Sequence, residues 1–208
     1  MSDAERDFWE RTASRYDRVT KGLLGRPVPR AAELTAGAVA GAGDVLEVAA
    51  GTGLLTAAFA PGAGRVVATD LADNMLAVLG ERMKGAGITN VETARRDIDA
   101  LGYPPASFDV VVAGNVLHLV PDLDRALDAL CYVLRPGGTL VAPTFVHDET
   151  LRSKVLSRVF GAFMVMHRRF TAASLRGALE RHGLRVVSGE TIRGPIPIAF
   201  VAARRTRD

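Results

Sequence analysis

The chain has 208 residues, of which 48% are hydrophobic and 24% charged, and its formal net charge is +3. These values predict a globular chain with a sizeable core, exclude a disordered one, and give no electrostatic case for nucleic acid binding. The one cysteine, Cys131, excludes an internal disulfide, and no uncharged apolar run approaches the roughly 18 residues that a membrane span needs. With no signal segment expected at the start, these features favour a cytoplasmic protein.

Short β-branched runs alternate with longer helical patterns along the chain, which is typical of an α/β protein. Two helices are expected before the first strand, at Asp3–Val19 and Pro29–Val39. The next elements are expected to be a strand, a helix and a second strand, at Val45–Val48, Leu54–Phe59 and Arg65–Thr69.

Asp73 is predicted to be the N-cap of the next helix, over Met75–Lys84. Two strands, a helix and a fifth strand should follow, at Val91–Ala94, Phe108–Ala113, Leu123–Leu134 and Thr139–Phe145. The turn sequence Pro136-Gly137-Gly138 is expected to end that helix before the fifth strand begins. The fourth strand is apolar along most of its length, as expected for a parallel sheet that is covered on both faces.

The last part of the chain should hold a helical insert at Asp148–His167 and a helix that Thr171 caps. The final two strands are expected at Arg185–Ile192 and Ile196–Ala202, and three residues between them are too few for a parallel crossover, so the last strand should be antiparallel. One domain is expected, divided into N-terminal helices, a ligand-binding core, a helical insert and a C-terminal helix with two strands, at 1–42, 43–147, 148–170 and 171–208.

Polar residues follow several of the predicted strands, and in a doubly wound sheet these strand ends meet at the edge where ligands bind. Asp70 lies 19 residues beyond Gly51, the spacing at which an acid can bind a ribose. Gly51 and Gly53 fit the first two glycines of a dinucleotide fingerprint, but Thr56 occupies the third position and the Walker lysine is absent. A nucleoside with a small charged tail therefore fits better than a pyrophosphate.

Four motifs in order carry a resemblance to a known family: VLEVAAGTG, VVATDLADNML, RRDIDALGYPPASFDVVVAGNVLHLVPD and LRPGGTLVAPT. The chain resembles the class I S-adenosylmethionine-dependent methyltransferases, in the small-molecule branch that includes the ubiquinone/menaquinone-biosynthesis C-methyltransferases. The resemblance covers most of residues 5 to 145. It implies a Rossmann-like α/β fold with a seven-stranded sheet of order 3-2-1-4-5-7-6, the seventh strand antiparallel, and helices on both faces.

The resemblance also implies S-adenosylmethionine as the cofactor, with S-adenosylhomocysteine as its product, and it assigns roles to matching positions. The family usually has glycine at position 49, where this chain has alanine. These positions would contact the methionine part, the ribose, the adenine and the sulfonium of the cofactor. They are Tyr16, Glu47, Ala49, Ala50, Gly51, Gly53, Asp70, Leu71, Met75, Asp97, Ile98, Asn115 and Val116.

Two histidines that follow strand ends, His118 and His147, are candidate general bases for an acceptor that must lose a proton. His118 has the alternative of a local hydrogen bond or a cap near Asp122. A site that combines these histidines with His167 is not expected to bind metal, because no i,i+4 pair or cysteine partner supports it.

The insert at Asp148–His167 carries an apolar stripe and a basic flank. Helices at this point often cover the substrate in the family, so a small hydrophobic or aromatic substrate is expected to contact Phe160, Phe163, Met164 and His167. The stripe is equally well explained by core packing or a homodimer face, and the basic flank leaves open membrane contact with a lipid or quinone. The expected reaction is in-line methyl transfer by a monomer or homodimer, and the alternative class is a non-catalytic cofactor-binding protein.

Overall fold

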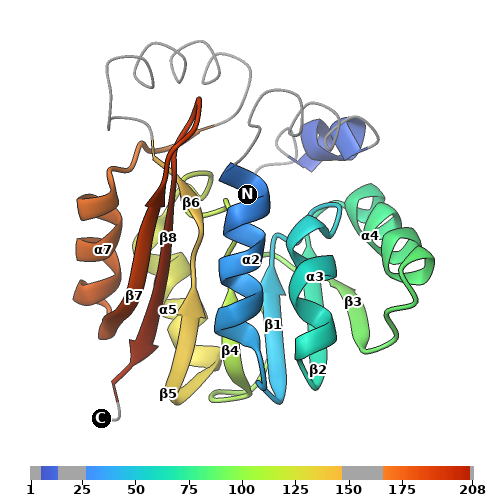
Figure 1. The fold of residues 1–208 in the computed structure, drawn as a ribbon, viewed down its shortest axis with the longest axis horizontal. Helices are drawn as coiled ribbons and strands as arrows, with labels where there is room; N and C mark the ends of the chain where they lie inside the picture. The colour runs from blue at the N-terminus through green and yellow to red at the C-terminus, as the bar shows by residue number, and fades with distance from the viewer. Residues whose placement is uncertain (1–5, 14–26, 147–165, 207–208) are drawn as a thin grey trace.

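The computed structural model describes residues 6–13, 27–146 and 166–206, and these form one mixed sheet flanked by helices (Figure 1). The strand order is β3-β2-β1-β4-β5-β8-β6, and β7 pairs with the other edge of β8. Strands β1 to β5 pair in parallel, whereas β8 is antiparallel to β5, β6 and β7. The strands are β1 Asp44–Val48, β2 Arg65–Asp70, β3 Val91–Arg95, β4 Phe108–Val112, β5 Leu134–Val141, β6 Thr144–Phe145, β7 Leu184–Ile192 and β8 Ile198–Arg205.

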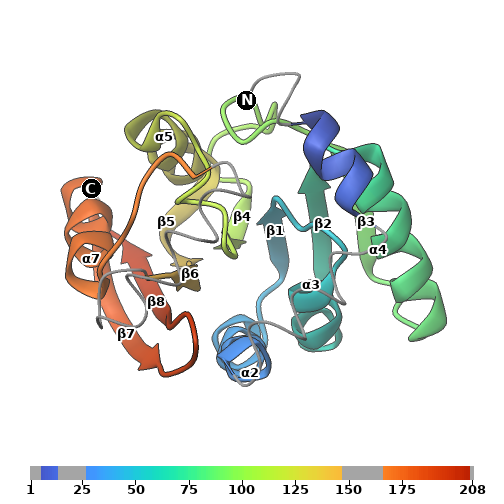
Figure 2. The ribbon, with the colours of Figure 1, turned by 90° about the horizontal axis from the view of Figure 1, so that it is seen from above.

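Helices lie on both faces of this sheet, as Figure 2 shows from above. Helices α2 and α3 lie against one face, and α5 and α7 lie against the other. Helix α4 follows β2 and packs near β2 and β3. The helices are α2 Pro27–Val39, α3 Leu54–Phe59, the short 3-10 turn η1 Ala60–Gly62, α4 Asp73–Gly85, α5 Leu123–Val133 and α7 Ala172–Arg181, and residues 6–13 are helical as well.

Two apolar layers hold the helices to the sheet, and β4 contributes to both. Val111 points into the layer beneath α5 and α7, whereas Val110 and Val112 point into the layer beneath α2. This alternation explains the nearly continuous apolar sequence of β4, because a strand covered on both faces needs apolar side chains on both. The predicted doubly wound α/β fold and its strand order are confirmed.

The predicted fifth strand is divided in the structure into β5 and β6. Pro143 lies between them and has no backbone N–H for the sheet, while its carbonyl oxygen accepts a hydrogen bond from the N–H of Asn115 at 2.7 Å. The strand also begins earlier than expected, so that Pro136-Gly137-Gly138 lies inside β5 rather than before it. The register between β4 and β5 shifts at Phe108–Val110, and Gly137 adopts a φ of +78°, which is how a bulge accommodates these residues.

The prediction that Asp73 caps helix α4 is wrong. The helix begins at Asp73, the N-cap position is Ala72, and Ala72 supplies no side-chain hydrogen bond. The carboxylate of Glu10, 63 residues earlier in the chain, instead accepts the N–H groups of Asp73 at 2.7 Å and Asn74 at 2.8 Å. By contrast, Thr171 caps α7 as predicted, with a reciprocal capping box through Ser174.

Candidate cofactor-binding site

The loop after β1 is held in a left-handed backbone conformation at three positions. Ala49 has a φ of +50°, Gly51 of +56° and Gly53 of +78°. A Cβ atom at Gly53 would lie 2.7 Å from Cγ of Leu79, so this position requires glycine on both conformational and steric grounds. Alanine at position 49 takes on a strain of roughly 1–2 kcal/mol, which is the physical reason that glycine suits this position better.

Asp70, the last residue of β2, connects this loop to the start of α4. Its Oδ2 atom accepts the N–H of Gly51 at 2.8 Å, and its Oδ1 atom accepts the N–H of Ala72 at 3.0 Å. Each carboxylate oxygen keeps capacity for a further donor. Burial raises the pKa of Asp70 from its ordinary value, the backbone donors oppose this shift, and the nearby charge of Glu10 adds to it.

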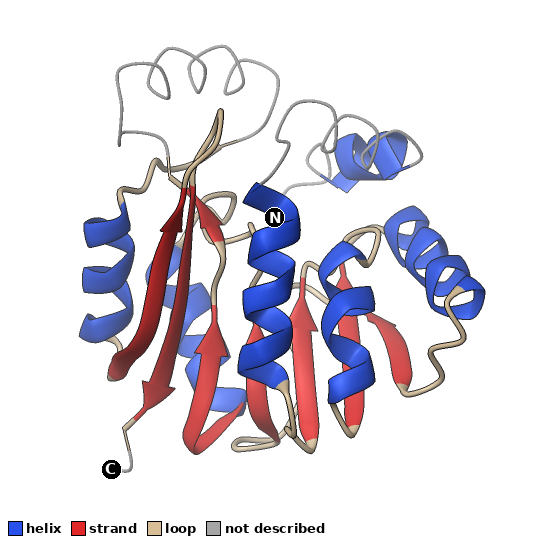
Figure 3. Cartoon of the chain, viewed as in Figure 1, coloured by secondary structure: helices blue, strands red, loops and turns tan. Residues whose placement is uncertain are grey.

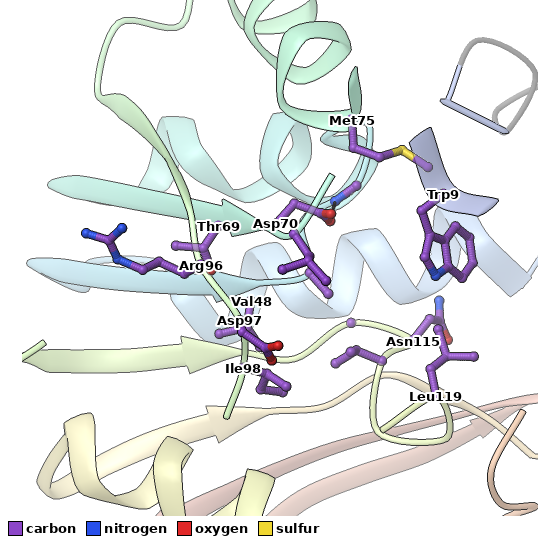
Figure 4. A pocket seen from close by; sticks show the side chains of 15 residues that line it. Trp9, Val48, Thr69, Asp70, Met75, Arg96, Asp97, Ile98, Asn115 and Leu119 are labelled. Carbon is purple, nitrogen blue, oxygen red and sulfur yellow. Dashed lines mark hydrogen bonds between the residues drawn. The ribbon is translucent and has the colours of Figure 1, made fainter. Parts of the chain in front are cut away.

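A cavity opens at the carboxyl ends of β1, β2 and β4, and Figure 4 shows the side chains around it. It brings together nine of the residues that the sequence predicted for the cofactor: Ala49, Gly51, Asp70, Leu71, Met75, Asp97, Ile98, Asn115 and Val116. Two carboxylates from different strand ends, Asp70 and Asp97, therefore face one space.

Sequence reasoning missed six residues that line the same cavity: Trp9, Val48, Thr69, Arg96, Gly114 and Leu119. Trp9 was within reach of the sequence, because it precedes the predicted contact Tyr16 by seven residues, or two helical turns, and so falls on the same face of the predicted helix. Tyr16 itself lies outside the described residues. Val48 and Thr69 each end or nearly end a strand, where side chains face the cavity edge.

A second cavity adjoins the first and shares Ala49, Gly51, Gly114 and Asn115 with it. Glu47 and Ala50, both predicted cofactor contacts, line this second cavity, whereas Gly53 lines neither and abuts Leu79. The rest of the lining includes apolar side chains of α2, α3 and β8, namely Val28, Ala31, Leu54, Leu55 and Ile198.

Glu47 is 2% exposed and accepts a hydrogen bond from the hydroxyl of Thr56. Burial raises the pKa of Glu47 to about 8, the bond from Thr56 opposes this rise, and the charge of Asp70 adds to it. The side chain is therefore mainly protonated at neutral pH, and a cation placed beside it would favour its ionised form.

Asn115 lies in the wall that the two cavities share. Its backbone is left-handed, with a φ of +53°, and its N–H is bound to the carbonyl of Pro143. The side-chain Oδ1 atom is buried and has no hydrogen-bond partner within the described parts of the chain. A buried acceptor without a partner costs about 1–3 kcal/mol, so a ligand N–H or O–H would be stabilised at this atom.

The candidate bases stand apart from these cavity walls. His118 is 1% exposed, and its ring meets that of Phe145 edge-on at 5.9 Å, but it is not part of the lining of either cavity. His167 is exposed at its side chain, and its N–H donates to the carbonyl of His118 at 3.1 Å. The other predicted residues, His147, Phe160, Phe163 and Met164, lie outside the described residues.

Clusters of metal-ligating side chains and membrane-spanning helices also bear on the class of site. Within residues 6–13, 27–146 and 166–206, no three histidine, cysteine or acidic side chains lie close enough together to hold a metal ion. Over the same residues, no helix has the length and apolar character needed to cross a bilayer.

Curated relatives match the central part of the chain. The ubiquinone/menaquinone biosynthesis C-methyltransferase UbiE of Enterobacter sp. (strain 638) is 38% identical over 105 residues, which cover 49% of this chain and 42% of that protein. The UbiE protein of Hydrogenovibrio crunogenus is 40% identical over 105 residues, which cover 49% of this chain and 41% of that protein. The match thus spans less than half of the length of either relative.

Solved structures share the fold over nearly the full chain. The DhpI–SAH complex has a TM-score of 0.78 at 24% identity and covers 99% of this chain and 97% of its own. The [4+2]-cyclase SpnF has a TM-score of 0.72 at 18% identity, with coverage of 86% and 81%. The family model described as a methyltransferase domain matches residues 46–142, the segment that builds most of the cavity walls. Residues 46–142 are therefore similar to a methyltransferase domain, in agreement with the resemblance that the four sequence motifs carry.

Proposed function

We propose that the chain binds S-adenosylmethionine at the carboxyl edge of the sheet and transfers the methyl group to a small hydrophobic or aromatic molecule. The observation that carries the proposal is the placement of Asp70. Its two oxygens are fixed by the N–H groups of Gly51 and Ala72, and they retain acceptor capacity for the two hydroxyls of a ribose. Asp97 and Ile98, proposed to hold the adenine, line the same cavity.

The charge of the site fits this cofactor better than a dinucleotide. Asp70 and Asp97 line the first cavity together with Arg96, and Glu47, whose ionised form a neighbouring cation would favour, lines the second. The two acids of the first cavity outnumber its one base, so the site suits a cationic sulfonium and ammonium group better than a pyrophosphate. Gly51 lies in both walls, and a Cβ atom at this position would meet nothing within 4 Å, so the backbone is open to close approach by a ligand.

The cofactor, when bound, supplies a methyl group already activated by its positive sulfur. The task of this chain is then to align an acceptor in line with that methyl group and to exclude water. Asn115 is proposed to contact the ligand through its Oδ1 atom, and Glu47 through its charge when ionised. His118 and His147 stay candidates for a general base, which only an acceptor with a proton to lose requires.

The apolar part of the second cavity supports a hydrophobic acceptor. Its side chains from α2, α3 and β8 lie beside Asn115, next to the cavity proposed for the nucleoside. We propose that the insert, with Phe160, Phe163, Met164 and His167, completes the apolar wall around the acceptor. A lipid or quinone acceptor methylated on carbon is the second candidate, because the curated relatives are named as ubiquinone/menaquinone C-methyltransferases.

A non-catalytic cofactor-binding protein is the alternative from another class, since a fold alone does not decide chemistry. Calorimetry with S-adenosylmethionine, S-adenosylhomocysteine and NAD, followed by methyl transfer from labelled cofactor to a panel of phenols, quinols and amines, separates these functions. We expect micromolar binding of the first two ligands and turnover of at least one apolar acceptor. Binding without turnover on any acceptor would favour the non-catalytic class, and preferential NAD binding would refute the cofactor assignment.

A further inference from the structure

The helix at residues 6–13 lies beside the first turn of α4, above the carboxyl edge of the sheet (Figure 3). It is far from α4 in sequence, so its position depends on tertiary contacts. Three hydrogen bonds join the two helices at one residue. The Glu10 carboxylate accepts the N–H groups of Asp73 and Asn74 at 2.7 and 2.8 Å, and the Glu10 carbonyl accepts from Nδ2 of Asn74 at 3.2 Å.

These bonds are of a kind that fixes orientation. The first N–H groups of a helix have no partner within the helix and carry its positive end, so a carboxylate that binds two of them is held both by direction and by charge. Glu10 binds through both oxygens at once, which restricts rotation of its own helix about the contact. An apolar contact accompanies them, because Ala13 packs against Ala72 and Met75.

The adjacent residue on the short helix is Trp9, and it lines the cofactor cavity. Figure 4 shows its ring beside Met75 and facing Asn115 and Leu119 across the cavity. Trp9 is also the single tryptophan of the chain. The other lining residues belong to the sheet edge, its loops and the first turn of α4, so Trp9 is the lining residue that the helix at residues 6–13 contributes, and its place depends on the contact of this helix with α4.

We infer that Glu10 is a positioning residue: by binding the first turn of α4 it holds Trp9 in the cavity wall, and its loss speeds release of the cofactor. The inference rests on the proposed function for the identity of the ligand, but not for the contact itself. Glu10 acts through Trp9 and does not line the cavity. The same carboxylate lies close enough to raise the pKa of Asp70, so the contact also bears on the proposed ribose acceptor.

The first experiment needs no ligand. Fluorescence of Trp9 and its quenching by acrylamide are measured in the wild type, Glu10→Ala and Glu10→Gln. We expect a red shift and stronger quenching in Glu10→Ala, and an intermediate result in Glu10→Gln, because the amide keeps one acceptor oxygen. Asp7→Ala is the matched control, since Asp7 is an exposed acid on the same helix that forms an ion pair with its neighbour Arg6, at 3.5 Å. Equal quenching in all four proteins would overturn the inference.

The second experiment measures release of S-adenosylhomocysteine by stopped flow. Loss of the cap should raise the release rate roughly fivefold in Glu10→Ala, with kcat for an accepted substrate changed far less than KM for the cofactor. Unchanged release would refute the positioning role. Failure of the wild type to bind this ligand would instead refute the proposed function, and the quenching result would still test the contact.

A double-substitution cycle separates positioning from a general loss of stability. With Trp9→Ala already present, Glu10→Ala should change cofactor affinity by calorimetry little further, because both substitutions remove the same wall. Additive losses would mean that Glu10 acts independently of Trp9 and would overturn the inference. Thermal unfolding of each variant shows whether the chain remains folded, and Glu10→Gln carries the test if Glu10→Ala does not.

Discussion

The acidic side chains at the two ends of the parallel sheet have different kinds of partner. At the amino end, Asp44 of β1 and Asp109 of β4 both bind the guanidinium of Arg135, at 3.1 and 2.6 Å. At the carboxyl end, Glu47 of β1 and Asp70 of β2 have no basic partner within the described parts of the chain, and they bind hydroxyl and backbone donors instead.

The pKa shifts follow this difference. At the amino end, the N–H of Asp44 and the nearby Arg135 lower the pKa of Asp109. At the carboxyl end, burial raises the pKa of both Glu47 and Asp70. Acids with raised pKa values beside a cavity mark a candidate binding site, whereas acids neutralised by an arginine contribute to the fold. One end of the sheet is therefore built for stability, and the other holds acids without a basic partner in the described residues, whose ionised form a cationic ligand would favour.

The largest expected effect concerns Glu47, whose folded pKa of about 8 exceeds its ordinary value of 4.5. Between these values the unfolded chain is ionised at this residue and the folded chain is not, so stability falls as pH rises, by up to about 1.4 kcal/mol per pH unit. Glu47→Gln should remove this loss. The free energy of unfolding of the variant should then exceed that of the wild type by an amount that grows with pH and reaches on the order of a few kcal/mol at pH 8. Urea unfolding of both proteins at pH 5, 6.5 and 8 measures the difference.

Asp109→Asn is the matched control at the other end of the sheet. The pKa of Asp109 is lower in the folded chain than in the unfolded chain, so its ionised form stabilises the fold at any pH above the pKa of the unfolded state. This stabilisation is lost as the pH falls through the pKa of the folded state. Asp109→Asn should therefore be less stable than the wild type near neutral pH and approach it in acid. The same pH dependence in Glu47→Gln and Asp109→Asn would break the contrast between the two ends.

Asp70→Ala tests the ligand end directly. Removing a charged acceptor of hydrogen bonds should cost about 1.5–3 kcal/mol of binding free energy for S-adenosylhomocysteine. The measurement is calorimetry at pH 7.5, with Asp109→Ala as a control that should keep wild-type affinity. Unchanged affinity in Asp70→Ala would contradict its role as the ribose acceptor.

Arg135→Met tests the structural end. Arg135 pairs with two acids but is partly exposed, so its loss should reduce stability by only about 1 kcal/mol and leave cofactor binding unaltered. The stability difference should shrink in high salt, because exposed charges are screened. Chemical denaturation at low and high salt provides the measurement, and a loss of cofactor affinity here would show that the two ends are coupled.

The smallest effect is expected at Ala49, in the left-handed loop after β1. Ala49→Gly relieves backbone strain but adds freedom to the unfolded chain, so we expect a net gain of about 0.5 kcal/mol. Ala50→Gly is the control, because Ala50 is not left-handed and should lose stability on the same change. Thermal unfolding compares the two, and a loss of stability in Ala49→Gly would show that the strain is compensated elsewhere.

The sequence by itself determined the order of strands and helices and most of the ligand edge. Hydrophobic periodicity and local turn residues act over a few residues, so they placed β1, β2 and α3 within a residue or two, and strand ends in a parallel sheet necessarily share an edge. This is why the predicted residues that follow strand ends, among them Asp70, Asp97 and Asn115, meet in one cavity, whereas Leu71 and Met75 were assigned through the family resemblance.

Only the tertiary structure decided the contacts that cross long stretches of chain. The cap of α4 by Glu10 and the place of Trp9 depend on how a separate helix docks, which no local pattern encodes. Pro143 ends β5 through the sheet hydrogen bonds it cannot make, and Gly137 lies in a bulge because β4 and β5 are paired there. The raised pKa of Glu47 arises from burial among segments that come together only on folding. A glutamate in the unfolded chain is ionised at neutral pH, whereas Glu47 in the folded chain keeps its proton.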